Sequence, residues 1–300
     1  MACNHHYKEF LVALILLSLP QTAWAQTQGA ASPPAPPSCN RAAFRAVIDV
    51  GHTLEEPGAM SARGITEYQF NLALAKAIEQ KLMAAGFSRT MMLVTSGPAM
   101  KGLFSRVRNA NTTQADVFLS IHHDSVPEQF LENWDHDGKP NRFSNRFTGH
   151  SLFVSFDNPE LKASLLFGKL LGNQLKARDL QYTRHYTEAI MGSRRRELVD
   201  PDAGVYRYDK LIVLRETTMP AVLLEGGMIV NRNDEQTLAS PERQALVAAA
   251  VTDAVDKFCD QRTVEKARLL ALAKRAKKAA KTVKDALKRT FSWPSNPFTR

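Results

Sequence analysis

Apolar residues fall into two kinds of run along the chain, short continuous runs and longer runs with a helical spacing. Residues 44–50 form a short run that stops at Gly51-His52, which predicts a buried strand leading into a loop. Residues 66–85 predict a helix, which Thr66 is suited to cap and Gly86 to end. The apolar residues with helical spacing there are Phe70, Leu72, Ala73, Ala77, Ile78 and Leu82.

The same two patterns continue through most of the chain. They predict strands at 91–95, 117–121 and 151–156, helices at 103–115, 161–177 and 241–258, and strand-like segments at 211–214 and 221–225. This alternation predicts an α/β fold: one domain, residues 41–260, whose central, mostly parallel twisted sheet is flanked by helices. Two polar stretches, 127–150 and 178–210, predict surface insertions outside the sheet.

The composition supports one folded domain with a charged tail. A hydrophobic content of 44% in 300 residues is enough for one sizeable core, and 23% charged residues exclude a wholly disordered chain. The net charge is +9, but residues 261–300 alone hold twelve Lys/Arg and two Asp/Glu. In this tail Leu269, Leu272, Ala276, Ala280, Val283 and Leu287 follow a spacing of three or four, which predicts a basic amphipathic C-terminal helix.

The N-terminus has the features of a secretory signal peptide, residues 1–25. Lys8 precedes an apolar run at 10–19, and Ala23-Trp24-Ala25 is a small-x-small cleavage site. The run is short for a membrane span, and a Pro-rich linker at 26–40 follows it, so cleavage is favoured over an uncleaved anchor or a buried helix. We therefore expect an exported, periplasmic protein.

Two cysteines, Cys39 and Cys259, remain after removal of the signal peptide, and they bracket the predicted domain. In an oxidising compartment they could form one disulfide, whereas the alternative is two unpaired thiols. Their separation does not fit a zinc finger.

Four residues that can carry chemistry stand where predicted strands end or helices begin. His52 and His122 each follow a strand, Glu67 opens a helix, and Glu225 closes an apolar strand. Ligands gather at the carboxyl ends of strands in a parallel α/β sheet, so these side chains could converge. Two imidazoles and one carboxylate form a common protein shell for catalytic zinc.

Together with their neighbours, these residues resemble the zinc-dependent N-acetylmuramoyl-L-alanine amidases of the AmiA/AmiB/AmiC type. The resemblance covers about 47–258 and is carried by Asp49-Val50-Gly51-His52, by Gly64 and Glu67, by the run from Leu103 to His122, and by Val213-Leu214-Arg215 with Met219 to Gly227 and Asn231. It implies an α/β enzyme that holds Zn²⁺ through His52, Glu67 and His122. It also implies Glu225 as general base and acid in cleaving the amide between N-acetylmuramic acid and L-alanine of peptidoglycan, in wall remodelling, turnover or daughter-cell separation.

The chain departs from the family pattern at several positions. Val50 stands for a usual Pro, Thr53 for a usual Gly, and His123-Asp124 for Ala-Asn. His123 could contact substrate or be a bystander. Glu55 offers a rival ligand set, because His52-Thr53-Leu54-Glu55 has the His-x-x-Glu spacing of zinc carboxypeptidases.

Two other functions stay open at this stage: a non-catalytic cell-wall-binding regulator on the same fold, and a zinc carboxypeptidase acting on stem peptides. We expect a monomer that binds peptidoglycan and no nucleic acid. The basic tail could dock on an anionic membrane or cell-wall surface. The sequence identifies neither an activator protein nor the preferred stem peptide.

Overall fold

A computed structural model describes residues 38–290 of the chain. The predicted signal peptide, most of the predicted linker and residues 291–300 of the tail lie outside the described residues, so these boundaries stay predictions. Within residues 38–290, no helix is long and apolar enough to cross a bilayer.

A seven-stranded sheet forms the centre of the fold, in the order β2-β1-β3-β9-β6-β8-β7. The strands β2, β1, β3 and β9 are parallel to one another, and β6 is parallel to β8. The pairs β6/β9 and β7/β8 are antiparallel. A separate hairpin, β4–β5, lies outside this sheet. The strands are β1 (Ala46–Val50), β2 (Met91–Leu93), β3 (Val117–Asp124), β4 (Glu132–His136), β5 (Lys139–Phe143), β6 (Ser151–Val154), β7 (Glu197–Asp200), β8 (Val205–Arg207) and β9 (Ala221–Met228).

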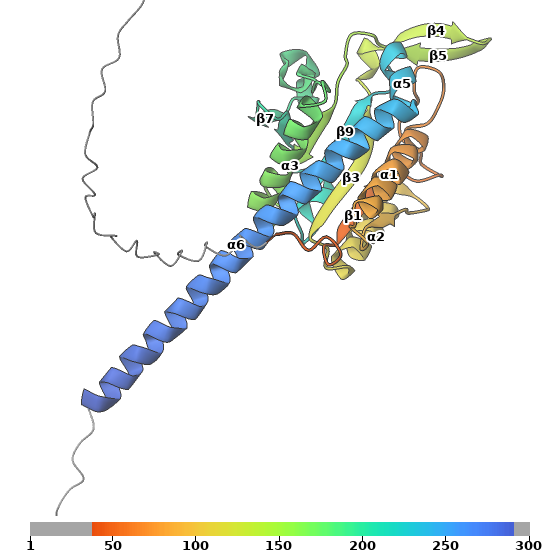
Figure 1. The fold of residues 1–300 in the computed structure, drawn as a ribbon. Helices are drawn as coiled ribbons and strands as arrows, with labels where there is room; N and C mark the ends of the chain where they lie inside the picture. The colour runs from red at the N-terminus through yellow and green to blue at the C-terminus, as the bar shows by residue number, and fades with distance from the viewer. Residues whose placement is uncertain (1–37, 291–300) are drawn as a thin grey trace, which may run out of the picture. The chain divides into compact units, whose positions relative to one another are not determined.

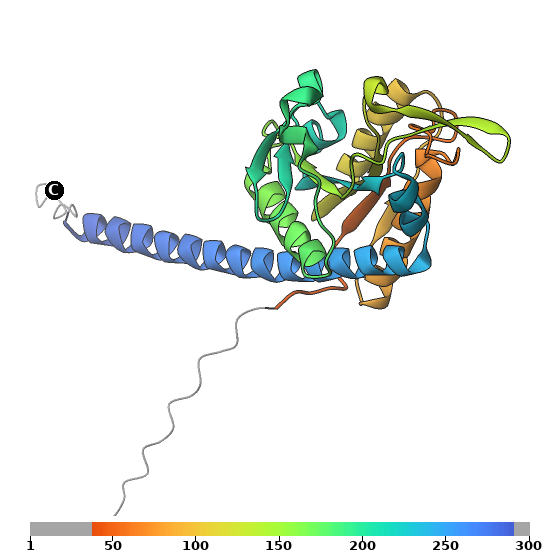
Figure 2. The ribbon, with the colours of Figure 1, turned by 90° about the horizontal axis from the view of Figure 1, so that it is seen from above.

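Helices cover both faces of the sheet, as Figures 1 and 2 show. One face packs against α1, α3 and α6, and the other against α2 and α4. Because both faces are covered, β1 and β3 are buried along almost their whole length, which explains their continuous apolar runs. The helices are α1 (Glu67–Ala84), α2 (Ala99–Thr112), α3 (Leu161–Lys176), α4 (Ile212–Arg215), α5 (Arg232–Leu238) and α6 (Pro241–Thr290), with 3₁₀ turns at Glu128–Phe130, His185–Thr187 and Ala189–Arg194.

The predicted fold class is confirmed: a single α/β domain with a mostly parallel sheet, flanking helices and a C-terminal helix. The final helix and the basic helix of the tail are one continuous element, α6. No proline interrupts its interior, because the only proline of α6 is Pro241 at its first position, where a missing N–H costs nothing.

Two expectations about local structure are wrong. Residues 211–214 do not form a strand; Ile212–Arg215 is one helical turn, whose apolar run cannot be told from a strand by periodicity. The carbonyl of Leu214 is satisfied by the side-chain amide of Asn158, at 2.7 Å. The polar stretch 178–210 is not a surface insertion, because it supplies β7 and β8 to the main sheet and buries Tyr206 completely.

Residues at the two ends of the described domain are joined. Cys39, which precedes β1, forms a disulfide with Cys259 of α6. The backbone N–H of Cys39 also donates to Asp260, at 2.7 Å, and Arg41 pairs with Asp256, at 2.7 Å. The structure therefore resolves the alternatives left open for the two cysteines in favour of the disulfide.

Candidate metal centre and its neighbouring carboxylates

The sheet topology brings His52, Glu67 and His122 to one edge. β1 and β3 are parallel neighbours, so His52, two residues after β1, lies close to His122 near the end of β3. His52 Nε2 lies 3.0 Å from Glu67 Oε2, and His122 Nδ1 lies 3.0 Å from Glu67 Oε1. Each residue offers a donor atom, and all three donors lie within 4.8 Å of one another. This set of two nitrogens and one carboxylate fits a zinc ion.

The carboxylate of Glu67 is buried and held from several sides. It accepts the backbone N–H of Ala59, at 3.2 Å, and the side-chain amide of Asn71, at 3.3 Å. Burial works to raise the pKa of Glu67, but hydrogen bonds and charge from His122 and His52 outweigh burial and lower it. The group is therefore held as a carboxylate, the form that a metal ligand needs.

Two glycines leave room for these side chains. A Cβ on Gly51 would lie 2.4 Å from His122 Nε2, and a Cβ on Gly58 would lie 2.5 Å from Glu67 Oε2 and 2.7 Å from the His52 ring. Gly58 also has φ +79°, a conformation that side chains rarely adopt. The backbone thus approaches the three side chains so closely that a Cβ at either position would displace them.

A buried ion pair positions the loop that carries His52. Arg106 of α2 pairs with Asp49 of β1, at 3.1 Å, and donates to the backbone carbonyl of His52, at 2.6 Å. Ser120 of β3 donates to the other oxygen of Asp49, at 2.7 Å. His52 itself has φ 65°, so this support holds a backbone conformation that is uncommon for a residue with a side chain. One sign of this pair is visible in the sequence, because Asp49 is a charged residue inside the apolar run of β1. The sequence alone did not indicate its role.

Glu225 lies beside His122, because β9 pairs with β3 in the register that sets these two residues opposite each other. The Oε2 atom of Glu225 is inaccessible to solvent and has no hydrogen-bond partner among the described residues. Burial, followed by the charges of Asp124 and Glu67, raises the pKa of Glu225 well above its usual value, against a smaller opposing effect of Arg194. A carboxylate in this setting binds a proton more readily than one in water.

A second cluster lies next to Glu225 and was missed by the sequence analysis. Tyr186 donates to Asp124 at the end of β3, at 2.6 Å, and Arg194 donates to the backbone carbonyl of Ser125, at 3.0 Å. Burial raises the pKa of Asp124 to about 6, although the hydrogen bond from Tyr186 and the charge of Arg194 oppose it. Tyr186 and Arg194 come from the polar stretch expected to be a surface insertion, so composition alone gave no sign of their place.

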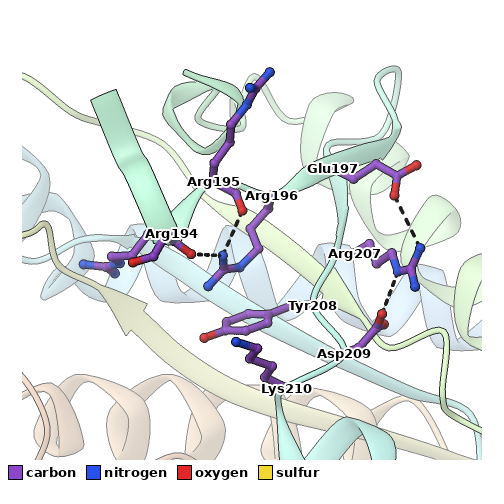
Figure 3. Close-up of a pocket in the computed structure, with 9 residues that line it drawn as sticks. Arg194, Arg195, Arg196, Glu197, Arg207, Tyr208, Asp209 and Lys210 are labelled. Carbon is purple, nitrogen blue, oxygen red and sulfur yellow. Dashed lines mark hydrogen bonds and ion pairs between the residues drawn. The ribbon is translucent and has the colours of Figure 1, made fainter. Parts of the chain in front are cut away.

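Arg194 also borders a groove lined by several basic side chains (Figure 3). The guanidinium of Arg196 lies 3.7 Å from the centre of the Tyr208 ring. Arg207 is paired with Asp209, at 2.7 Å, and with Glu197, at 3.6 Å. Much of the positive charge of the groove is therefore already engaged by neighbouring groups.

The sequence left open the roles of two residues near the candidate ligands, Glu55 and His123, and the structure shows the surroundings of each. Glu55, the rival ligand, is exposed and accepts the backbone N–H of Gly97, at 2.9 Å, and it is not part of the metal-binding group found within residues 38–290. His123 is buried, its Nδ1 lies 2.8 Å from Asn71 Oδ1, and burial lowers its pKa to about 3. His123 thus supports Asn71, which in turn contacts Glu67.

Comparison with known proteins agrees with this arrangement. The sequence model of the N-acetylmuramoyl-L-alanine amidase family (Amidase_3) matches residues 46–257, which is most of the chain and contains all four predicted site residues. The chain belongs to this family. The amidase class of enzyme expected from the sequence is thereby confirmed.

Individual members of the amidase family support both the sequence match and the fold. AmiA of Escherichia coli is 25% identical, over 71% of this chain and 75% of its own length. The catalytic domain of the amidase CwlV from Bacillus (Paenibacillus) polymyxa is 27% identical, with a TM-score of 0.51 over 72% of this chain and 97% of that domain. The amidase Ami1 of Mycobacterium smegmatis, 20% identical, shares the fold with a TM-score of 0.58 over 73% of this chain and 98% of its own.

Proposed function

We propose that this amidase is zinc-dependent and hydrolyses the amide between N-acetylmuramic acid and L-alanine in peptidoglycan. One observation supports the proposal above all: His52, Glu67 and His122 converge at one edge of the sheet, and Glu225 lies beside His122 on the neighbouring strand. The three converging side chains would hold the ion. When bound, zinc polarises the carbonyl of the scissile amide and lowers the pKa of water at the site.

Glu225 is the residue that would transfer protons during the reaction. Its carboxylate would take a proton from the water that attacks the amide carbonyl carbon, as general base. When the carbon–nitrogen bond breaks, the same carboxyl group would give that proton to the departing nitrogen of L-alanine. Glu225 thus ends the cycle as the carboxylate that began it.

The decisive experiment measures zinc content and reaction products in one set of variants. Glu225→Gln should keep its zinc and lose activity by about a thousandfold, within the range of general acid–base catalysis. His52→Ala should lose both zinc and activity. Glu55→Gln is the matched control, because Glu55 also follows His52 closely but is exposed and points to Gly97. Its zinc and turnover should match the wild type.

Mass spectrometry of the digested muropeptides separates the remaining functions. An amidase frees intact stem peptides and leaves unsubstituted glycan, whereas a carboxypeptidase only trims terminal residues. A non-catalytic regulator would release no label from dyed sacculi. Full activity in Glu225→Gln would remove this residue as the general base.

We further propose that the protein is exported and acts on the wall from the periplasm, in remodelling, turnover or daughter-cell separation. The apolar run at 10–19 with Ala23-Trp24-Ala25 supports export, and the disulfide between Cys39 and Cys259 is typical of an oxidising compartment. N-terminal sequencing of the protein from the periplasmic fraction should begin at Gln26. A chain that keeps Met1 in the cytoplasmic fraction would contradict this location.

A further inference from the structure

The second half of α6 contributes nothing to the domain core. Residues of the first half, such as Val251 and Phe258, are completely buried between α1 and α3. From Arg268 to Arg289, by contrast, every residue is exposed. Figures 1 and 2 show this part of the helix continuing past the sheet. We call residues 268–289 the exposed segment.

The exposed segment can stay helical without packing, because it is rich in Ala, Lys and Leu, which have high helix propensity. It is also longer than the minimum of about 12–15 residues below which isolated helices are marginal in water. The segment therefore needs no partner to remain helical. The pattern of its side chains, however, calls for an apolar surface against which to pack. An apolar stripe on a helix normally faces a core or another apolar surface.

Such a stripe runs along the exposed segment. Successive residues of a helix are about 100° apart around its axis, and on this basis the residues of the stripe fall within a sector of about 80°. The larger ones have exposed fractions of 59% for Leu269, 49% for Leu272, 59% for Val283 and 53% for Leu287. Ala276 and Ala280 fill the same sector between them. Leu270, with an exposed fraction of 56%, lies outside the stripe and serves below as a control.

The rest of the circumference is strongly basic. The exposed segment holds nine Lys/Arg and one acidic residue, Asp285, and a second acidic residue, Glu265, lies just before it. Glu265 is close to two cations of its own, with Lys162 at 3.6 Å and Arg262 at 3.7 Å, so it neutralises little of the charge farther along. Six lysines lie outside the sector of the stripe: Lys274, Lys277, Lys278, Lys281, Lys284 and Lys288.

We propose that the exposed segment binds the surface of an anionic phospholipid bilayer. It would lie in the plane of the interface, with the apolar stripe among the acyl chains and the lysines at the lipid phosphates. Anionic wall polymers would satisfy the charges alone, whereas a bilayer also takes up the apolar stripe. The segment cannot span the bilayer instead, because within the described residues no helix is apolar enough to do so. This proposal does not depend on the catalytic one.

Cosedimentation of the proposed exported form, residues 26–300, with vesicles tests the proposal. The wild type should bind phosphatidylglycerol/phosphatidylcholine vesicles and should bind pure phosphatidylcholine vesicles far more weakly. A chain of the same form that ends at Ala267 measures any binding by the residues before the exposed segment, which all variants share. Thermal unfolding midpoints should stay at the wild-type value, because every substituted residue is exposed.

Substitutions separate the stripe from the charges. Replacing Leu269, Leu272, Val283 and Leu287 together by Gln keeps helix propensity and should weaken vesicle binding about tenfold or more. Leu270→Gln makes the same chemical change off the stripe and should bind as the wild type does. The double variant Lys277→Gln/Lys281→Gln should weaken binding about 25-fold, since each cation near an anionic surface contributes about fivefold.

Three results would overturn the proposal. One is equal binding by the wild type and the chain that ends at Ala267. Another is equal binding by the four-site stripe variant and Leu270→Gln. The third is retention of the wild type on purified sacculi, or by a protein partner, without binding to anionic vesicles.

Discussion

Replacing Gly51 by Ala should disable the metal centre while leaving the fold intact. Gly51 follows β1 and continues its pairing with β3 through a hydrogen bond from its N–H to the carbonyl of Ile121, at 2.9 Å. An added Cβ would lie 2.4, 2.5 and 2.6 Å from three atoms of the His122 ring. Both strands are fixed in the sheet, so the ring has to give way.

The size of the effect follows from these distances. Nonbonded heavy atoms are separated by about 3.5 Å or more, so the imidazole would have to retreat by about 1 Å. Disturbing the surroundings of a ligand costs about 10- to 100-fold in metal affinity. A misplacement of about 1 Å can cost about 100-fold in rate. We therefore expect zinc affinity to fall at least tenfold, and turnover to fall about 100-fold even at saturating zinc.

Gly102→Ala in α2 is the matched control. Its new Cβ would lie 3.5 Å from Thr53 Cγ2, an ordinary contact, and the change removes a glycine from a helix interior. This variant should keep zinc and activity and gain up to about 1 kcal/mol in the free energy of unfolding. Zinc titration, amidase turnover and thermal unfolding measure both variants. Wild-type zinc affinity and turnover in a folded Gly51→Ala protein would refute the idea that the bare backbone makes room for His122.

Two further predictions concern stability. Replacing Cys39 by Ser opens a disulfide that spans 220 residues of sequence. Urea denaturation should then show a loss of up to about 5 kcal/mol in the free energy of unfolding. An unchanged denaturation midpoint would contradict this. Burial lowers the pKa of His150 to about 3, so below about pH 6.5 the unfolded state binds a proton that the native state does not. Stability should therefore fall on acidification from about pH 6.5 toward pH 3, by about 1.4 kcal/mol per pH unit for this proton, and His150→Gln should remove that part of the slope in urea titrations.

The sequence predicts the sheet and the approach of the four site residues because both depend on local patterns. A short apolar run that ends in a chemically active residue identifies a buried strand and the edge where its side chains gather. His52 and His122 meet for this reason, and parallel pairing of β1 with β3 needs no further information. The roles of these residues in binding zinc and in catalysis stay predictions.

The cluster around Asp124 could not be predicted in the same way. Tyr186 and Arg194 lie 62 and 70 residues away from Asp124 in the sequence. They belong to a stretch whose polar composition is typical of a surface loop. Its polar groups are buried because they satisfy one another, a condition that depends on three-dimensional partners and leaves no periodic signal. The helical turn at Ile212–Arg215 was missed for a related reason, since the four apolar residues at 211–214 are too few to define a period.

The two proposed functions, catalysis and bilayer binding, belong to opposite ends of the domain. The candidate metal centre lies at the carboxyl ends of β1 and β3, and Glu225 lies beside it inside β9, which continues to Met228 and does not end at Glu225 as the sequence predicted. The disulfide lies at the opposite edge of the sheet, because Cys39 precedes the amino end of β1, and α6 continues from Cys259 into the exposed segment. A protein that binds a bilayer through that segment would therefore keep its catalytic edge remote from the lipid. The disulfide would hold this polarity, since it ties the start of the domain to the point where the exposed part of α6 begins.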